Sequence, residues 1–211
     1  MLVIDLNRRA LAVAPDLLGA RLTSTIGGEQ VTVRVVEVEA YEGTDDPASH
    51  AYRGERPRNR VMFGPAGHLY VYRHLGLHHC ANVVVGPAGT ASAVLLRGAE
   101  VVEGVDVAWR RRLAGGVCRT ERDLARGPAR LAVVLGLTRE HDGVTLGHEP
   151  GAAQLWLEPA TSRTEQVATG PRVGIAGAGE DAASWPWRFW LAGHPCVSGS
   201  VRAAGGGTGR R

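Results

Sequence analysis

Two glutamates, Glu37 and Glu39, alternate with apolar residues in the segment Val31–Tyr41. Side chains alternate between the faces of a β-strand, so both carboxylates and Tyr41 share one face with three valines. The two glutamates then lie about 7 Å apart along the strand, on an otherwise apolar face. A carboxylate in such a place can act as a general base. The alternative is a glutamate on the exposed edge of a sheet.

The charge changes sign directly after this segment. Residues 29–49 hold six acidic residues and one arginine, whereas residues 50–97 hold six arginines, one acidic residue and five of the eight histidines. All four tyrosines fall within residues 41–72. This pattern is typical of a site that binds a polyanion while carboxylates do chemistry, although two solvated faces of a fold would produce it too.

The elements that must position these residues are short strands and helices. Apolar spacing predicts a helix over residues 6–19, capped by Asp5 and kinked or split at Pro15. Gly27-Gly28 predicts a hairpin turn before the strand Val31–Tyr41, and residues 43–68 predict a long ordered loop. Further strands are expected at Leu69–Tyr72, His78–Val85, Ala91–Leu96, Leu155–Leu157 and Arg188–Leu191, and further helices at Thr120–Ala125 and from Pro128 to near Gly136.

The composition excludes several classes of protein. A chain of 211 residues with 44% hydrophobic residues can form one domain with a core. Its apolar runs are far shorter than the roughly 20 residues that span a bilayer, and Asp5 interrupts any signal peptide. Three widely spaced cysteines predict no disulfide framework and favour the cytoplasm. All 24 basic residues are arginine, so no lysine can form a Schiff base.

Seven motifs follow one another along nearly the whole chain: VEVEAYEGTDDPASH (36–50), RPRNRVMFGPAGHLYVY (56–72), HHCANVVV (78–85), AVLLRGAEVVEG (93–104), RGPARL (126–131), RVGIAGAGE (172–180) and RFWLAGHPCVS (188–198). Together they resemble the alkyladenine, or 3-methyladenine, DNA glycosylase family. The resemblance implies an α+β fold, in which a single domain (residues 1–198) has a curved antiparallel sheet, surrounding helices and a protruding β-hairpin. Residues 199–211 are predicted to form a disordered basic tail.

The activity implied by the resemblance is the removal of alkylated or deaminated purines from double-stranded DNA. Such an enzyme flips the damaged nucleotide out of the duplex and hydrolyses its N-glycosidic bond, which leaves an abasic site. It needs no cofactor. We expect a monofunctional enzyme, because strand nicking through a Schiff base lacks its lysine, and a monomer that acts on the cytoplasmic nucleoid and binds no membrane.

The resemblance also assigns roles in the base pocket. Glu39 is expected to activate water, and Tyr41, His50 and Tyr72 to hold the flipped base between their rings. Asn82 is expected to exclude guanine by a clash with its exocyclic amine. The alternatives are core aromatic residues, a loop histidine and an asparagine bonded to the backbone.

Two further residues complete the expected pocket. Arg97 is expected to lie near the base and the catalytic water, or else to form a salt bridge at a strand end. Glu37 is expected to be structural and paired with Arg34 or Arg97.

The expected DNA contacts come from the hairpin and from arginines. Leu75 occupies the tip where the family usually has an aromatic wedge, and an apolar wedge can still fill the gap left by a flipped base. Phosphate contacts are expected from Arg53, Arg56, Arg58, Arg60, Arg73 and Arg130.

Other functions fit the sequence less well. The run His78-His79-Cys80 does not predict a metal site, because neighbours on a strand point to opposite faces. A non-catalytic nucleic-acid-binding protein would not need Glu39. A sugar glycosidase would pair Glu37 or Glu39 with Asp45 or Asp46 as a second acid.

Overall fold

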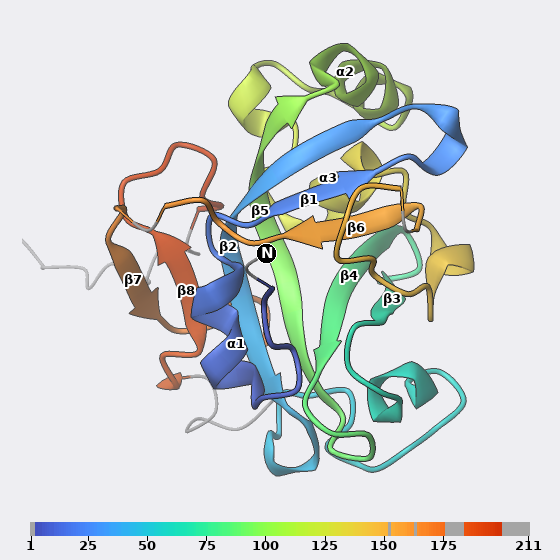
Figure 1. The fold of residues 1–211 in the computed structure, drawn as a ribbon, viewed down its shortest axis with the longest axis vertical. Coiled ribbons are helices and arrows are strands. Elements are labelled where there is room, and N and C mark those ends of the chain that lie inside the picture. The colour runs from blue at the N-terminus through green and yellow to red at the C-terminus, as the bar shows by residue number, and fades with distance from the viewer. Residues whose placement is uncertain (1–2, 152, 163, 176–183, 200–211) are drawn as a thin grey trace, which may run out of the picture.

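Two long antiparallel strands, β2 (Val31–Glu42) and β5 (Ser92–Glu103), run through the middle of the molecule (Figure 1). The sheet extends from them in the order β3-β4-β5-β2-β1-β6, and the pair β7–β8 joins it through β2. The structure is a computed structural model and describes residues 3–151, 153–162, 164–175 and 184–199. The predicted tail therefore lies outside the described residues, apart from Gly199.

The other strands are short and surround this centre. Their bounds are β1 (Arg21–Ser24), β3 (Leu69–His74), β4 (His78–Val85), β6 (Leu155–Glu158), β7 (Val167–Gly170) and β8 (Arg188–Leu191). The α-helices of the described residues are α1 (Ala10–Leu17), α2 (Val105–Ala114) and α3 (Pro128–Val134). None of these helices has the length and hydrophobicity needed to cross a membrane.

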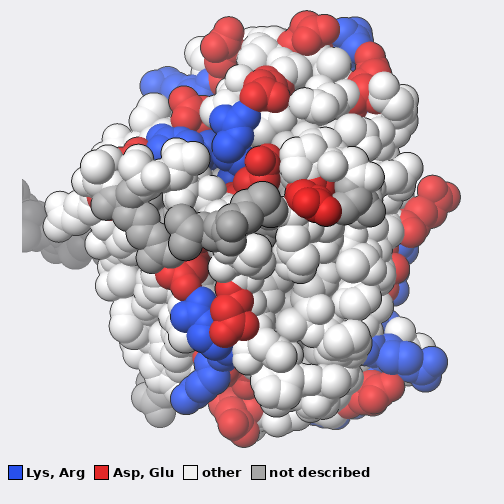
Figure 2. Space-filling view, in the orientation of Figure 1, with Lys and Arg blue, Asp and Glu red and all other residues white. Residues whose placement is uncertain are grey.

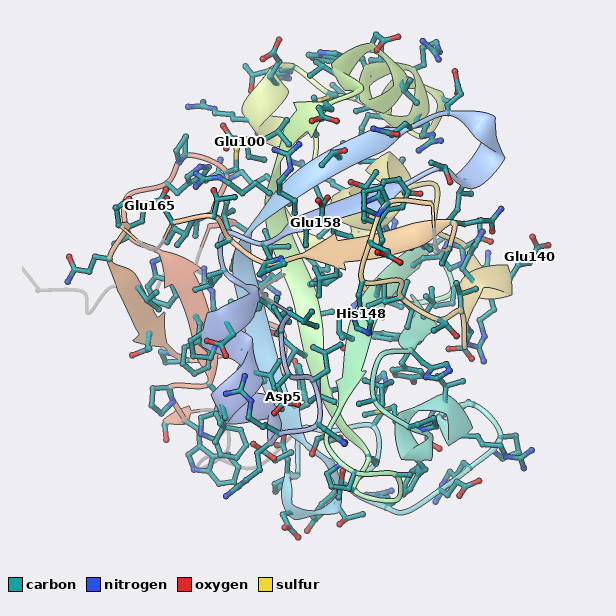
Figure 3. The ribbon with its side chains drawn as sticks, viewed as in Figure 1. Asp5, Glu100, Glu140, His148, Glu158 and Glu165 are labelled. Atoms are coloured by element: carbon teal, nitrogen blue, oxygen red, sulfur yellow. The ribbon has the colours of Figure 1, made fainter. Side chains whose placement is uncertain are left out.

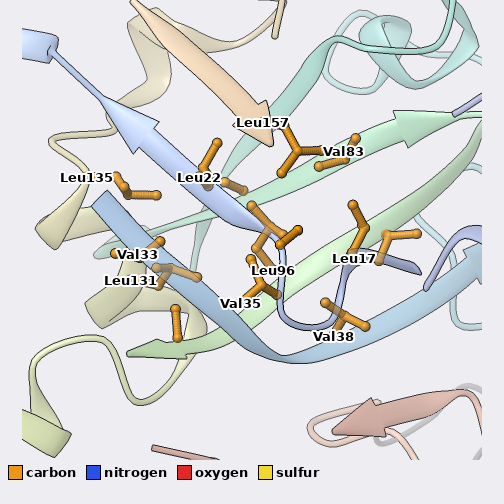
Figure 4. Packing of buried hydrophobic residues seen from close by; sticks show 14 of the residues in the cluster. Leu17, Leu22, Val33, Val35, Val38, Val83, Leu96, Leu131, Leu135 and Leu157 are labelled. Atoms are coloured by element: carbon orange, nitrogen blue, oxygen red, sulfur yellow. The ribbon is translucent and has the colours of Figure 1, made fainter. Parts of the chain in front are cut away.

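The core lies between the sheet and helices α1 and α3 (Figure 4). Leu17 of α1, Leu22 of β1, Leu96 of β5 and Leu131 of α3 are all at most 1% exposed and belong to one cluster. Burying a leucine side chain contributes about 1.5–3 kcal/mol. This cluster therefore holds the helices on the sheet and keeps β2 rigid.

Irregular pairing bends β2 at the position of its glutamates. The register against β5 shifts between Val35 and Glu37 and again between Glu37 and Val38. Such bulges bend a strand and increase its twist. On the opposite side, Glu37–Glu39 pair with Trp190–Arg188 of β8. The glutamates therefore lie in an interior strand, which excludes the exposed-edge alternative.

The long connection between β2 and β3 is well anchored. A Cβ at Gly43 would lie 2.0 Å from the carbonyl oxygen of Thr90, and Gly43 has a φ of +65°, so only glycine fits directly after β2. Asn59 is fully buried and donates to the carbonyl oxygens of His50 and Gly54. The predicted ordered loop is confirmed, with short 3₁₀ turns at Gly43–Asp45 and Arg60–Phe63.

The predicted fold is confirmed: an α+β domain with a curved antiparallel sheet, helices against it and the hairpin β3–β4. The hairpin at Gly27-Gly28 is also confirmed, since β1 and β2 pair there. The helix predicted from Pro128 is confirmed as α3, with proline in its first turn. The strand predicted over Ala91–Leu96 is the first half of β5.

Three predictions about helices need correction. The helix predicted over 6–19 begins only at Ala10, because Asp5 accepts a bond from the Asn7 amide in a turn instead of capping a helix. Pro15 does not split α1, which continues past it and ends two residues later at Leu17. The helix predicted over Thr120–Ala125 is only a 3₁₀ turn at Glu121–Asp123.

Candidate active site

Glu39 is fully buried, and three groups contact its carboxylate. The Tyr41 hydroxyl donates to Oε2 at 3.0 Å, the Val173 amide donates to Oε1 at 2.7 Å, and a guanidinium nitrogen of Arg97 lies 3.5 Å from Oε1. Burial raises the pKa of Glu39, and the negative charge of Glu37 raises it further. The contacts with Arg97, Val173 and Tyr41 lower this pKa, but burial is the largest effect. A raised pKa is typical of a carboxyl group tuned toward proton transfer near neutral pH.

Glu37 has a different environment, although it also is fully buried. Its Oε1 accepts bonds from Arg97 at 2.8 Å, from Arg188 at 2.7 Å and from the Ser198 hydroxyl at 2.9 Å, and its Oε2 accepts from the Ser198 amide at 2.6 Å. Both carboxylate oxygens are thus engaged within the protein. The predicted pairing with Arg97 is confirmed, whereas the alternative with Arg34 is wrong.

Arg34 lies at the other end of β2, where it donates to Glu165 and Glu100. Figure 3 labels both carboxylates, on the side of the molecule that carries β7. A bulged strand does not keep strict alternation of its side chains between the two faces. The spacing in the sequence therefore could not decide whether Arg34 or Arg97 pairs with Glu37.

A cavity of about 410 Å³ is lined by Tyr41, whose hydroxyl donates to the buried Glu39 carboxylate, whereas Glu39 itself does not line it. This volume is within the range of small-molecule sites. Residues from β2, β3, β4 and the loop 43–68 line it together with two residues that follow Val173. They are Tyr41, Pro47, Ala48, Ser49, His50, Tyr52, Arg53, Arg56, Arg58, Met62, Tyr70, Tyr72, His74, Asn82, Gly174 and Ile175.

Aromatic rings form one wall of the cavity. The rings of His50 and Tyr72 meet edge to face at 4.5 Å between centroids, and Tyr70 stacks on Tyr72 at 5.6 Å. His50 Nδ1 and the Tyr70 hydroxyl lie 2.9 Å apart and share a hydrogen bond. Burial and the nearby charge of Arg58 lower the pKa of His50, so its ring is neutral at neutral pH.

The residues Tyr41, His50, Tyr72 and Asn82 all line the cavity, whereas Arg97 does not line it and forms the salt bridge that was its alternative. Asn82 lines the cavity and donates from Nδ2 to the Tyr70 carbonyl oxygen at 3.1 Å. Arg97 bridges Glu37 and Glu39 behind the cavity wall. Sequence reasoning missed Tyr70, although it alternates with Tyr72 on β3 and so had to share its face.

The described residues that line the cavity include three arginines and no carboxylate. Arg53, Arg56 and Arg58 form no salt bridge within the part of the chain that the structure describes. By contrast, Arg60 pairs with Glu55, and Arg130 lies 3.8 Å from Asp123. On the face shown in Figure 2, acidic and basic side chains are interspersed. The positive lining of the cavity is suited to a phosphate group.

The tip of the hairpin β3–β4 exposes apolar side chains next to basic ones. Leu75 is 79% exposed and Leu77 is 73% exposed, and they flank Gly76 between the paired residues His74 and His78. Arg73 precedes this tip and has an exposed side chain. Apolar side chains on a narrow ribbon fit the minor groove of DNA.

Comparison with known proteins decides the family. The sequence profile of the family described as "Methylpurine-DNA glycosylase (MPG)" matches residues 4–195. The chain belongs to this family.

Relatives that match almost the whole length of this chain support the same family. One from Leifsonia xyli subsp. xyli is 52% identical over 191 residues, which are 90% of this chain and 87% of the relative. One from Streptomyces avermitilis is 48% identical with the same coverage, and one from Mycobacterium tuberculosis is 44% identical over 94% of this chain and 96% of its own. Each bears the name "Putative 3-methyladenine DNA glycosylase".

The protein is therefore a DNA glycosylase by family, a hydrolase of N-glycosyl bonds. Within the described residues, this glycosylase has no group of three or more His, Cys, Asp or Glu side chains that could hold a metal ion. Asp46, considered above as the second acid of a sugar glycosidase, is fully buried in a salt bridge with Arg172.

Proposed function

We propose that this glycosylase flips alkylated or deaminated purines out of duplex DNA and hydrolyses their glycosidic bond, with Glu39 as the general base. The observation that carries the proposal is the contact between the buried Glu39 carboxylate and Tyr41, which lines the cavity. The Tyr41 hydroxyl thus links a buried carboxylate to an aromatic cavity of about 410 Å³, which is suited to one bound nucleotide.

The aromatic side chains support binding of a purine. A base between Tyr41 and the pair His50 and Tyr72 would gain about 1–3 kcal/mol per stacked face. Alkylated purines carry a positive charge, and the π-faces of tyrosine attract cations. Asn82 supports discrimination, because an exocyclic amine at purine position 2 would meet its side chain at the cavity wall.

Glu39 has the capacity to hold a water molecule. A carboxylate offers about four acceptor positions, and Tyr41 and Val173 each use one. The ionised form would accept a proton from water as the hydroxyl attacks C1′, and its charge would stabilise the oxocarbenium-like centre. Arg97, which does not line the cavity, would hold the Glu39 carboxylate in place through its positive charge.

DNA contacts follow from the exposed basic and apolar groups. We propose that Arg53, Arg56, Arg58 and Arg73 contact phosphates, with weaker contributions from Arg60 and Arg130, whose charges are partly paired. Leu75 would enter the gap left by the flipped nucleotide. A single chain contains all these groups, so we expect a monomer that acts on the nucleoid in the cytoplasm.

The acid side of the pH–rate profile should report on Glu39. Only the ionised carboxylate can act as a base, and burial raises its pKa above the ordinary 4.5, so the rate falls as the pH drops through that raised value. Arg97 lowers the pKa by its positive charge. Arg97→Met should therefore move the acid limb to higher pH. Single-turnover rates across the acid range measure this shift, and an unmoved limb would contradict it.

The hairpin tip should control the affinity for damaged DNA. Leu75→Ala removes apolar surface from the wedge and is expected to weaken binding to a lesion duplex by about tenfold, since burying three such carbons is worth more than 1.4 kcal/mol. Leu75→Tyr should bind more tightly, because an aromatic ring stacks on the exposed bases. Equilibrium binding measures both, with undamaged duplex as the control. Equal affinity of all three proteins would exclude a wedge at this tip.

A lesion panel tests the proposed function itself. Duplexes that hold 3-methyladenine, hypoxanthine or ethenoadenine are incubated with excess protein, and free base and strand breaks are measured separately. The proposal predicts release of at least one of these bases and an intact strand until the abasic site is cleaved by alkali. Salt-sensitive binding without any released base would indicate a non-catalytic nucleic-acid-binding protein instead.

A further inference from the structure

We propose that Arg172, held by Asp46, is a positioning residue that orients both the Tyr41 ring and the Val173 amide toward their places at Glu39. This inference rests on the proposed role of Glu39 as the base. Arg172 itself does not line the cavity.

The side chains of Arg172 and Asp46 form a salt bridge at 0% exposure. Two guanidinium nitrogens donate to the two carboxylate oxygens, at 2.5 and 2.9 Å, and one of them also donates to the carbonyl oxygen of Ala40 at 2.9 Å. Three bonds in one plane fix the orientation of a guanidinium group. Asp46 is fixed in turn, because it accepts a bond from the Ala48 amide.

The fixed guanidinium group lies between two aromatic rings. Its central carbon is 4.6 Å from the centroid of Tyr41 and 5.0 Å from that of Trp187. Trp185 packs on Trp187 with its ring tilted by 39°, at 4.3 Å between centroids. Tyr41 therefore has Arg172 on one face, which leaves its other face for the cavity that it lines. A rigid support of this kind keeps a stacking platform in place before a base arrives.

The position of the Arg172 backbone also sets the contact between Val173 and Glu39. Val173 follows directly, and its amide donates to Glu39 Oε1 at 2.7 Å. Gly174 and Ile175 come next and line the cavity. Anchoring Arg172 to Asp46 and to the Ala40 carbonyl therefore fixes the amide that binds the ionised form of Glu39.

Loss of this anchor should change the chemistry and not only the stability. A hydrogen bond to a carboxylate favours its ionised form, so a displaced Val173 amide makes Glu39 harder to ionise. The other groups that act on Glu39 are Arg97, Tyr41, Glu37, Tyr72 and Cys80. Tyr41 packs against Arg172, and a displaced Tyr41 hydroxyl would raise the pKa of Glu39 in the same direction as a displaced Val173 amide, because both hydrogen bonds favour the ionised form.

The test uses two variants of the full chain. Arg172→Met with Asp46→Asn removes both charges together, so that neither is left buried alone. Arg172→Lys keeps the charge pair but lacks the planar group that fits between two rings. Single-turnover rates on a lesion duplex are measured from acid to alkaline pH, with the active fraction taken from the reaction amplitude.

The matched control is Arg34→Met with Glu165→Gln. It removes another ion pair between β2 and the C-terminal part of the chain, and neither of its residues lines the cavity. We expect both Arg172 variants to show an acid limb at higher pH and a rate at neutral pH lowered about tenfold, as for the loss of one hydrogen bond to a charged group. The control should keep the limb and the rate of the unchanged protein.

Two results are decisive. If both Arg172 variants keep the limb and the rate constant, and only their active fraction or melting temperature falls, Arg172 is merely structural and the inference is wrong. Glu39→Gln, measured in parallel, separates this failure from that of the proposed function: a fully active Glu39→Gln variant would reject both.

Discussion

Glu39→Gln is expected to lower the single-turnover rate of base release by about 10²–10⁴-fold, which is the usual contribution of a positioned general base. Glutamine has the same shape but cannot accept the proton of water. Glutamine also has only one acceptor oxygen, so it loses the hydrogen bond from the Tyr41 hydroxyl or the one from the Val173 amide, which donate to the two carboxylate oxygens of Glu39. Base release from a lesion duplex under enzyme excess measures the loss.

Glu42→Gln is the matched control for this variant. Glu42 is another buried glutamate of β2, but it accepts from the Leu11 amide and the Ser92 hydroxyl and does not line the cavity. The control should keep its rate of base release. A Glu39→Gln variant as active as this control would remove Glu39 from the mechanism.

Glu37→Gln is expected to destabilise the fold by about 3–5 kcal/mol, because it leaves two buried arginines without full compensation. Arg97 and Arg188 both donate to Glu37 Oε1, and Ser198 loses an acceptor as well. For a chain of this size, the loss corresponds to a melting temperature lower by about 10 °C. Thermal and urea denaturation measure the change.

Glu165→Gln serves as the comparison for Glu37. Its salt bridge with Arg34 is part-exposed, and such pairs contribute at most about 1 kcal/mol. A Glu37→Gln protein as stable as this comparison would mean that the buried cluster around Glu37 contributes little. A stable Glu37→Gln protein without activity would assign Glu37 to the chemistry.

The local pattern of the chain predicted the strand with the glutamates and the hairpin, because both depend on neighbours in sequence. Alternation on β2 placed Glu39 with Tyr41 on a common face, and the same rule applied to β3 would have added Tyr70 to Tyr72. The same pattern could not identify the partners of Glu37 and Asp46. Arg188 and Arg172 are more than 120 residues away from them, and only the completed sheet brings them together.

The errors also have physical causes. The apolar spacing of residues 6–19 continues beyond the true helix, since residues before Ala10 bury the same face in an extended segment. Helix α2 was missed because it is rich in arginine and has only a weak apolar stripe. Arg111 of α2 instead holds the helix by donating to the carbonyl oxygens of Ile26 and Val134.

The most direct test of the central claim is a crystal structure of Glu39→Gln bound to a duplex with one ethenoadenine. We predict that the purine lies in the cavity between Tyr41 and the rings of His50 and Tyr72. The side chain at position 39 should bind a water molecule in line with C1′ of the deoxyribose. A damaged base still stacked in the duplex, or a flipped nucleotide whose C1′ is out of reach of residue 39, would contradict the account.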